Sequence, residues 1–193
     1  MKKLRSILPV YALSVTLIGT VVGIFTGCSG FSTSVQASEQ PNLLVAAKLE
    51  IAASNANGNK ETACSTFVMK VLNRAGYAVP AFSANDFEAV AATYLPSLTS
   101  RNFNAADSEN NQGRLREFLN SLGDGSVVIA QWPRINRSGH IAFIEKVATD
   151  SFVIYQAQAG LSLPHSKPTT IDALLYIRNQ WGDRSRMRIF YEN

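Results

Sequence analysis

A cysteine and a histidine in this chain of 193 residues are placed so that they could carry out nucleophilic catalysis. Cys64 begins an apolar stretch after a polar segment, and His140 follows Gly139 at the start of another. A thiol becomes an effective nucleophile when a base, usually histidine, takes its proton and a third polar group holds the imidazole in the correct tautomer. Cys64 is therefore predicted to be the nucleophile and His140 its base. The plainer interpretations are an inert core cysteine and a strand-edge histidine bonded to backbone.

The chain has two histidines, so the base has to be chosen between them. His140 opens a stretch that predicts a strand, which would fix its backbone on a rigid element. His165 lies between Pro164 and Pro168, where a loop is expected. Rigid placement favours His140 as the base.

The group that orients His140 is expected on the next strand along the chain. Gln156 and Gln158 share one face of that strand because side chains alternate. A glutamine carbonyl oxygen can accept the imidazole N–H, and either residue could serve. The backbone N–H of Cys64 is expected to help bind an oxyanion. Ser65 either assists there or is an ordinary first-turn residue.

The segment just before His140 offers candidates for substrate binding. Trp132 and Arg134 lie between two predicted strands, where an exposed tryptophan beside an arginine could line a groove for a carboxylate-bearing peptide. The alternative is a tryptophan that closes the core. Asn85 and Asp86 are expected to cap a helix.

These candidates require particular elements to position them. Apolar residues recur at helical spacing in 42–53, 62–76, 83–95 and 114–122. Short β-branched segments separated by turn residues predict antiparallel strands at 126–131, 140–148, 152–157 and 186–191, with a helix or turn at 171–179 before the last. Cys64 then lies in the first turn of a helix, which lowers the pKa of a thiol. The order predicts an α+β fold, with N-terminal helices packed on a small antiparallel β-sheet.

The first 27 residues have the order of a secretory signal, basic and then apolar. Phe25-Thr26-Gly27-Cys28 resembles a lipoprotein signal-peptidase box, which predicts a signal peptide at 1–27 and lipidation of Cys28. Cleavage after Ala37 and retention as an uncleaved anchor are the alternatives. Each places the body outside the cytoplasm, as a membrane-anchored lipoprotein or as a secreted or periplasmic protein.

Residues 28–41 are rich in Ser, Gln and Gly and predict a tether, so the folded domain is expected at 42–193. If Cys28 is lipidated or removed, Cys64 is the one thiol left in an exported protein. A lone thiol outside the cytoplasm is liable to oxidation and so calls for a reason.

The charge of the chain is concentrated in its first residues. The formal net charge is +4, but Lys2, Lys3 and Arg5 precede every acidic residue. Removing these three from the 18 basic residues leaves 15 against 14 acidic ones. A nearly neutral body without a basic cluster excludes nucleic acid as the expected partner.

Two segments carry a family resemblance. Gly139-His140-Ile141-Ala142-Phe143-Ile144-Glu145-Lys146-Val147, followed by Ile154-Tyr155-Gln156-Ala157-Gln158, resembles the histidine half of CHAP domains, the cysteine, histidine-dependent amidohydrolases/peptidases. Cys64-Ser65-Thr66-Phe67-Val68 is similar to the nucleophile helix of the related NlpC-type peptidases. The resemblance covers roughly residues 42–160.

The resemblance implies a papain-like fold and cleavage of an amide bond in peptidoglycan, by an endopeptidase or an N-acetylmuramoyl-L-alanine amidase. It implies no metal and no organic cofactor, and we expect a monomer whose one membrane contact is the N-terminal lipid or anchor. CHAP domains commonly carry a carboxylate and then an asparagine where Gln156 and Gln158 stand. This departure motivates the alternative of a weak or inactive domain that binds wall or protein.

Overall fold

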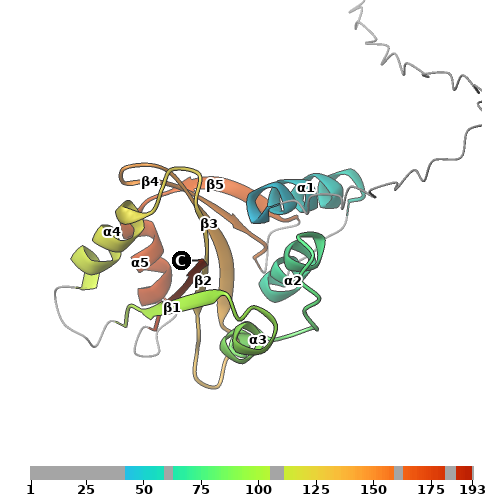
Figure 1. Cartoon of the computed structure of the whole chain (residues 1–193), viewed down its shortest axis with the longest axis horizontal. Coiled ribbons are helices and arrows are strands. Elements are labelled where there is room, and N and C mark those ends of the chain that lie inside the picture. The colour runs from blue at the N-terminus through green and yellow to red at the C-terminus, as the bar shows by residue number, and fades with distance from the viewer. Residues whose placement is uncertain (1–41, 59–62, 105–110, 159–162, 181–185, 193) are drawn as a thin grey trace, which may run out of the picture. The chain divides into compact units, whose positions relative to one another are not determined.

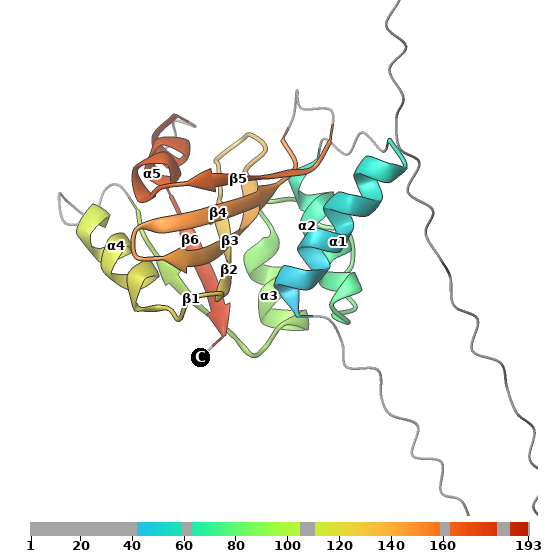
Figure 2. The same cartoon turned by 90° about the horizontal axis from the view of Figure 1, so that it is seen from above.

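One antiparallel sheet organises the part of the chain that the computed structural model describes, residues 42–58, 63–104, 111–158, 163–180 and 186–192. Its six strands are β1 (Leu98–Asn102), β2 (Val127–Trp132), β3 (His140–Ala148), β4 (Ser151–Gln156), β5 (His165–Thr169) and β6 (Arg188–Glu192). They are ordered β1-β6-β2-β3-β4-β5, so β1 and β5 form the edges (Figures 1 and 2). The predicted signal peptide, Cys28 and the tether lie outside the described residues.

Helices cover both faces of this sheet. α1 (Leu43–Ala56), α2 (Cys64–Arg74) and α3 (Phe87–Tyr94) lie on one side, and α4 (Asn111–Ser121) and α5 (Ile171–Gln180) on the other (Figure 1). Strand alternation divides the core between them. Ile141 and Phe143 of β3 pack with α1–α3, whereas Ala142 and Ile144 pack with α4 and α5. Apolar side chains therefore follow one another from Ile141 to Ile144 of β3.

The predicted α+β class, with N-terminal helices on an antiparallel sheet, is confirmed. The sequence did not reveal the edge strands. β1 is polar and mostly exposed, and β5 contains Pro168, which removes a backbone donor. Proline is tolerated in a sheet chiefly on an edge strand, where β5 lies. The expected loop around His165 is therefore wrong, since His165 begins this strand.

The α2 helix is fixed at both ends of its buried face. Phe67 and Val68 are fully buried, and the ring of Phe67 meets that of Phe143 edge-on with 6.3 Å between centroids. Near the other end, Arg74 donates to Oε2 of Glu50 on α1, over 2.8 Å from Nη2 and 3.2 Å from Nε. A helix held in this way presents its first residue at a defined place on the sheet.

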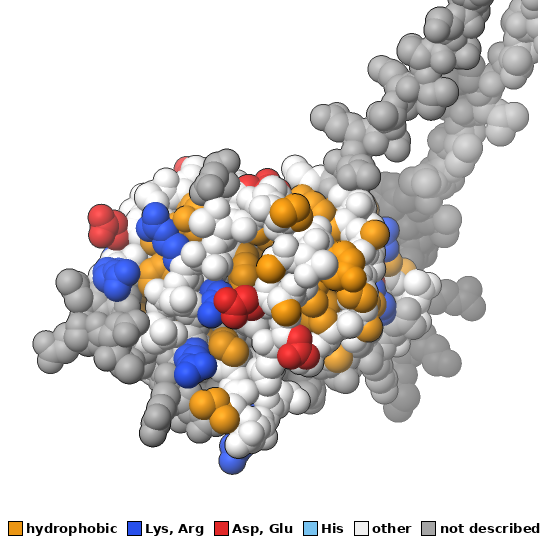
Figure 3. Space-filling model, turned by 60° about the horizontal axis from the view of Figure 1, so that its bottom comes forward, with side chains coloured by type: hydrophobic (Ala, Val, Ile, Leu, Met, Phe, Trp, Pro, Cys, Tyr) orange, Lys and Arg blue, Asp and Glu red, His pale blue; other side chains and the backbone are white. Residues whose placement is uncertain are grey.

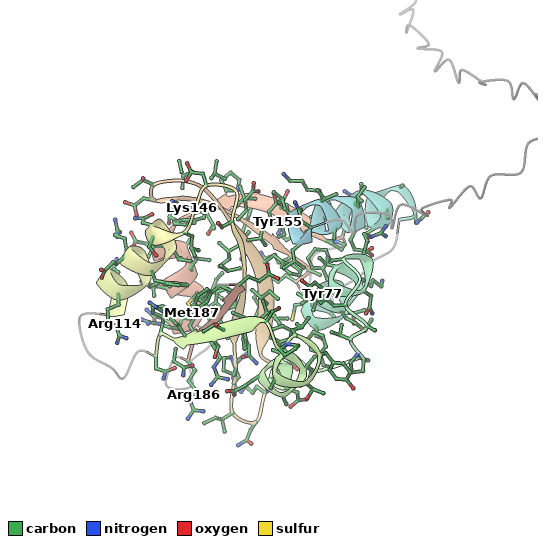
Figure 4. The ribbon with its side chains drawn as sticks, viewed as in Figure 1. Tyr77, Arg114, Lys146, Tyr155, Arg186 and Met187 are labelled. Carbon is green, nitrogen blue, oxygen red and sulfur yellow. The ribbon has the colours of Figure 1, made fainter. Side chains whose placement is uncertain are left out.

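On the opposite layer, a buried lysine joins β3 to α4. Nζ of Lys146 donates to the carbonyl oxygens of Asn120 (3.0 Å) and Leu122 (2.5 Å), and it pairs with Asp124 at 3.1 Å. Figure 4 shows Lys146 beside the end of α4. Cations at a helix C-terminus satisfy carbonyls that the helix itself leaves unpaired. Lys146 therefore caps the C-terminal end of α4.

The surface carries charges of both signs. On the face shown in Figure 3, acidic side chains stand among the Lys and Arg side chains of one half, and hydrophobic side chains gather on the other half. Among the described residues, no helix has the length and apolar content to span a membrane.

Candidate active site

Cys64 is the first residue of α2, in the position predicted for it. The residue before it, Ala63, is the N-cap and has no side chain that could accept a hydrogen bond from the first turn. The backbone N–H groups of Cys64 and Ser65 instead lie close enough to the thiol to lower its pKa. The helix end therefore turns its donors toward the sulfur.

The thiol contacts the chain on both sides of His140. The half-buried Sγ donates to the carbonyl oxygen of Gly139 over 3.9 Å, and the backbone N–H of Ile141 also interacts with it. Burial raises the pKa of Cys64 above its ordinary value and outweighs the lowering by the N–H groups of Ile141, Ser65 and Cys64. The resting group is therefore a thiol, whose proton has to be removed before the sulfur can attack.

The imidazole of His140 is held by Gln156. Its Nε2 lies 2.7 Å from Oε1 of Gln156, and both side chains are almost fully buried. Because an amide oxygen only accepts, Nε2 must carry the proton and Nδ1 the lone pair. Between the two glutamines that the sequence left open, the structure gives the orienting contact to Gln156.

Burial makes His140 a weak base at rest. Desolvation lowers the pKa of His140 to about 4, the hydrogen bond that His140 donates to Gln156 opposes that change, and the charge of His165 adds to it. His140 is 3% exposed, so the neutral imidazole is the form present at neutral pH. Cys64 and His140 therefore rest as thiol and imidazole.

Trp132 is not a groove residue. Its side chain is 1% exposed and packs in the core on the side of α4 and α5. Its ring lies against that of His140, with centroids 5.4 Å apart. The interpretation as an exposed substrate contact is wrong, and the alternative of a tryptophan that closes the core is correct. Strand pairing explains this, because Trp132 is directly opposite His140 in the sheet.

A pocket of about 460 Å³ opens at the start of α2. Cys64, Ser65, Arg134, His140 and Gln158 all line it. The structure thus brings together five of the seven residues predicted for catalysis and substrate binding in the domain. The other two, the orienting glutamine and the tryptophan, lie among the buried residues.

Asn85 holds the loop that leads into His140, and its interpretation as a helix cap is wrong. Asp86 is the N-cap of α3. The amide Nδ2 of Asn85 donates to the carbonyls of Arg134 (3.0 Å) and Arg137 (2.7 Å), and its Oδ1 accepts from the N–H of Arg134 (2.9 Å). These bonds fix the loop between β2 and β3 that leads into His140. No local sequence pattern indicates a contact across such a separation.

Gly139 is required by the same packing. A Cβ atom there would lie 2.4 Å from Oδ1 of Asn85 and 2.7 Å from the carbonyl oxygen of Trp132. Any side chain at Gly139 would therefore displace the loop that carries His140. Within the described ranges, no group of three His, Cys, Asp or Glu side chains is placed to hold a metal ion.

Comparisons with known proteins do not name a family for this chain. No protein-family model matches the sequence, and no curated protein matches it significantly. Among solved structures, the crystal structure of the Pseudomonas avirulence protein AvrPphB aligns with 77% of this chain and 70% of its own, at 11% identity and a TM-score of 0.37. The CHAP and NlpC-type resemblance rests on the motifs of this sequence.

Proposed function

We propose that this chain is an exported thiol hydrolase that cleaves an amide bond, with Cys64 as nucleophile and His140 as base. The observation that supports this most strongly is the position of the thiol. It contacts the backbone on both sides of His140, whose ring Gln156 holds with the lone pair on Nδ1. Both residues also line one pocket.

The proposed chemistry requires Nδ1 of His140 to reach the thiol, whose contacts with the β3 side of the site are to the backbone of Gly139 and Ile141. Nδ1 of His140 takes the proton of Cys64 as Sγ bonds to the carbonyl carbon of the substrate, and the carbonyl oxygen becomes an oxyanion. The N–H groups at the uncapped start of α2 stabilise that charge. The imidazolium then gives its proton to the nitrogen of the leaving amine as the C–N bond breaks. Water, deprotonated by His140, hydrolyses the thioester and regenerates the thiol.

The substrate class in this proposal is peptidoglycan, as an endopeptidase or amidase would cleave it. Its support is the CHAP and NlpC-type resemblance around Cys64 and His140 together with the predicted export signal. Arg134, half-buried at the pocket, is placed to attract the carboxylate of a stem peptide.

The test is digestion of purified peptidoglycan by the full-length protein, followed by mass spectrometry of the released fragments. Wild type is compared with Cys64→Ala and with Cys28→Ala, a matched control because these are the two cysteines of the chain. We expect release by wild type and Cys28→Ala and loss of release with Cys64→Ala. Equal release by Cys64→Ala would end the thiol mechanism.

A second function, a binding module without catalysis, is favoured by one observation. Burial raises the pKa of Cys64 and lowers that of His140, so the resting pair is uncharged. Incubation with purified peptidoglycan separates the two functions. Release of fragments that is lost in Cys64→Ala supports the hydrolase, whereas peptidoglycan that is bound but not cut supports the binding module.

A further inference from the structure

Three side chains from neighbouring strands form a connected row in the sheet. Nε2 of His140 on β3 lies 2.7 Å from Oε1 of Gln156 on β4, and Nε2 of the same amide lies 3.4 Å from Nε2 of His165 on β5. The register pairs Gln156 directly with His165. Gln156 is 1% exposed, so its amide is shielded from water between the two rings.

The hydrogen-bonding roles in this row depend on one another. The Gln156 amide has an acceptor end and a donor end, and a half turn about its last bond exchanges them. With the oxygen toward His140, the NH₂ group faces His165, whose Nε2 must then accept. His165 therefore carries its proton on Nδ1. The reversed amide would point N–H groups at His140, which could bond them only with its proton moved to Nδ1.

The surroundings of Nδ1 of His165 indicate which contact selects the tautomer of this histidine. Nδ1 of His165 is buried and has no hydrogen-bond partner among the residues that the structure describes. A buried unpaired N–H is unfavourable, so a bond at Nδ1 does not account for this tautomer. The contact with Gln156 at the other side of the ring does.

We propose that His165 is a positioning residue, which holds the Gln156 amide with its oxygen toward His140 and so keeps the lone pair of His140 on Nδ1. This inference rests on the proposed hydrolase function. His165 does not touch the reacting atoms and acts through Gln156 alone. Without His165, the Gln156 amide can rotate. In each molecule where it has rotated, His140 carries its proton on Nδ1, the nitrogen that should accept the proton of Cys64.

The test is a double-mutant cycle in the full-length protein, using His165→Phe and Gln156→Glu. A carboxylate has two equivalent oxygens and presents an acceptor to His140 in either orientation. In the Gln156 background, we expect His165→Phe to lower kcat on peptidoglycan by about tenfold with KM unchanged, as for loss of one orienting hydrogen bond. In the Gln156→Glu background, the same substitution should change kcat by less than about twofold.

Two controls separate positioning from a general effect on β5. His165→Gln, which again offers an acceptor, should restore part of the activity. Lys167→Phe, an aromatic substitution at an exposed position of the same strand, should leave kcat unchanged. Equal losses from His165→Phe in both backgrounds would overturn the proposal, because a merely structural role does not depend on the identity of residue 156.

A spectroscopic measurement keeps this inference distinct from the hydrolase proposal. Ring ¹⁵N shifts of the resting protein report which nitrogen of each histidine is protonated. We expect Nε2–H for His140 and Nδ1–H for His165 in wild type, and a mixture of tautomers for His140 in His165→Phe. Nε2–H for His165 in wild type would refute the positioning role, whatever Cys64→Ala does to hydrolysis.

Discussion

The burial of His140 predicts a specific loss of stability in acid. Desolvation lowers the pKa of His140 to about 4 in the folded chain, against 6.5 for an exposed histidine. Between these two pKa values, His140 therefore binds a proton in the unfolded state but not in the folded state. The stability contributed by the neutral ring is fully present above pH 6.5 and is lost as the pH falls toward 4.

The magnitude follows from this difference. One pKa unit is equivalent to about 1.4 kcal/mol, so the full loss is about 3 kcal/mol, most of which has occurred at pH 4.5. With an m-value of about 1–3 kcal/mol/M in urea, the midpoint falls by at least about 1 M. The loss is a large fraction of the stability of a small domain.

The measurement is urea denaturation followed by tryptophan fluorescence at pH 7.5 and pH 4.5, on wild type and His140→Gln. Glutamine at position 140 can still donate to Oε1 of Gln156 but does not titrate. All other titratable groups are common to the two proteins, so the difference between the two losses isolates His140. We expect wild type to lose about 2–3 kcal/mol more than His140→Gln between the two pH values. Equal losses would refute the reasoning and place the ring in contact with water.

Three further substitutions test the framework around the site. Gly139→Ala should cost about 1–3 kcal/mol in urea unfolding because its Cβ would meet Asn85, and peptidoglycan release should fall with it; unchanged stability and release would contradict this packing. Lys146→Met should cost about 1–3 kcal/mol and speed amide hydrogen exchange at the end of α4, because two partly buried carbonyls lose their donor; unchanged exchange would show that Lys146 does not cap the helix. Phe67→Ala should cost about 3–5 kcal/mol and speed alkylation of Cys64 as α2 loosens; an unchanged alkylation rate would show that Phe67 does not position the thiol.

The sequence was sufficient for the elements that carry the site because local patterns specify them. The apolar face of α2 recurs at helical spacing, which placed Cys64 in a first turn before any tertiary contact was known. β3 has a short apolar run directly after His140, from Ile141 to Ile144. Helices followed by short strands were enough to predict the α+β class. These properties depend on neighbours a few residues apart.

Other features depend on partners distant in the chain. The role of Asn85 comes from bonds to carbonyls about fifty positions later. The sequence did not show that α4 and α5 form a second helical layer on the other face of the sheet, because their patterns are those of ordinary amphipathic helices. β5 was missed because Pro168 discourages a strand everywhere except at an edge, and an edge exists only once the sheet is assembled.

By itself, the sequence determined which residues could do chemistry and which local elements hold them, because residue type and periodicity are properties of the chain. The tertiary structure alone decided between Gln156 and Gln158, buried Trp132, and set His165 against the Gln156 amide. Strand register and the packing of helices on both faces determine these outcomes. Neither can be read from any one segment, because each arises from contacts between segments that the sequence keeps apart.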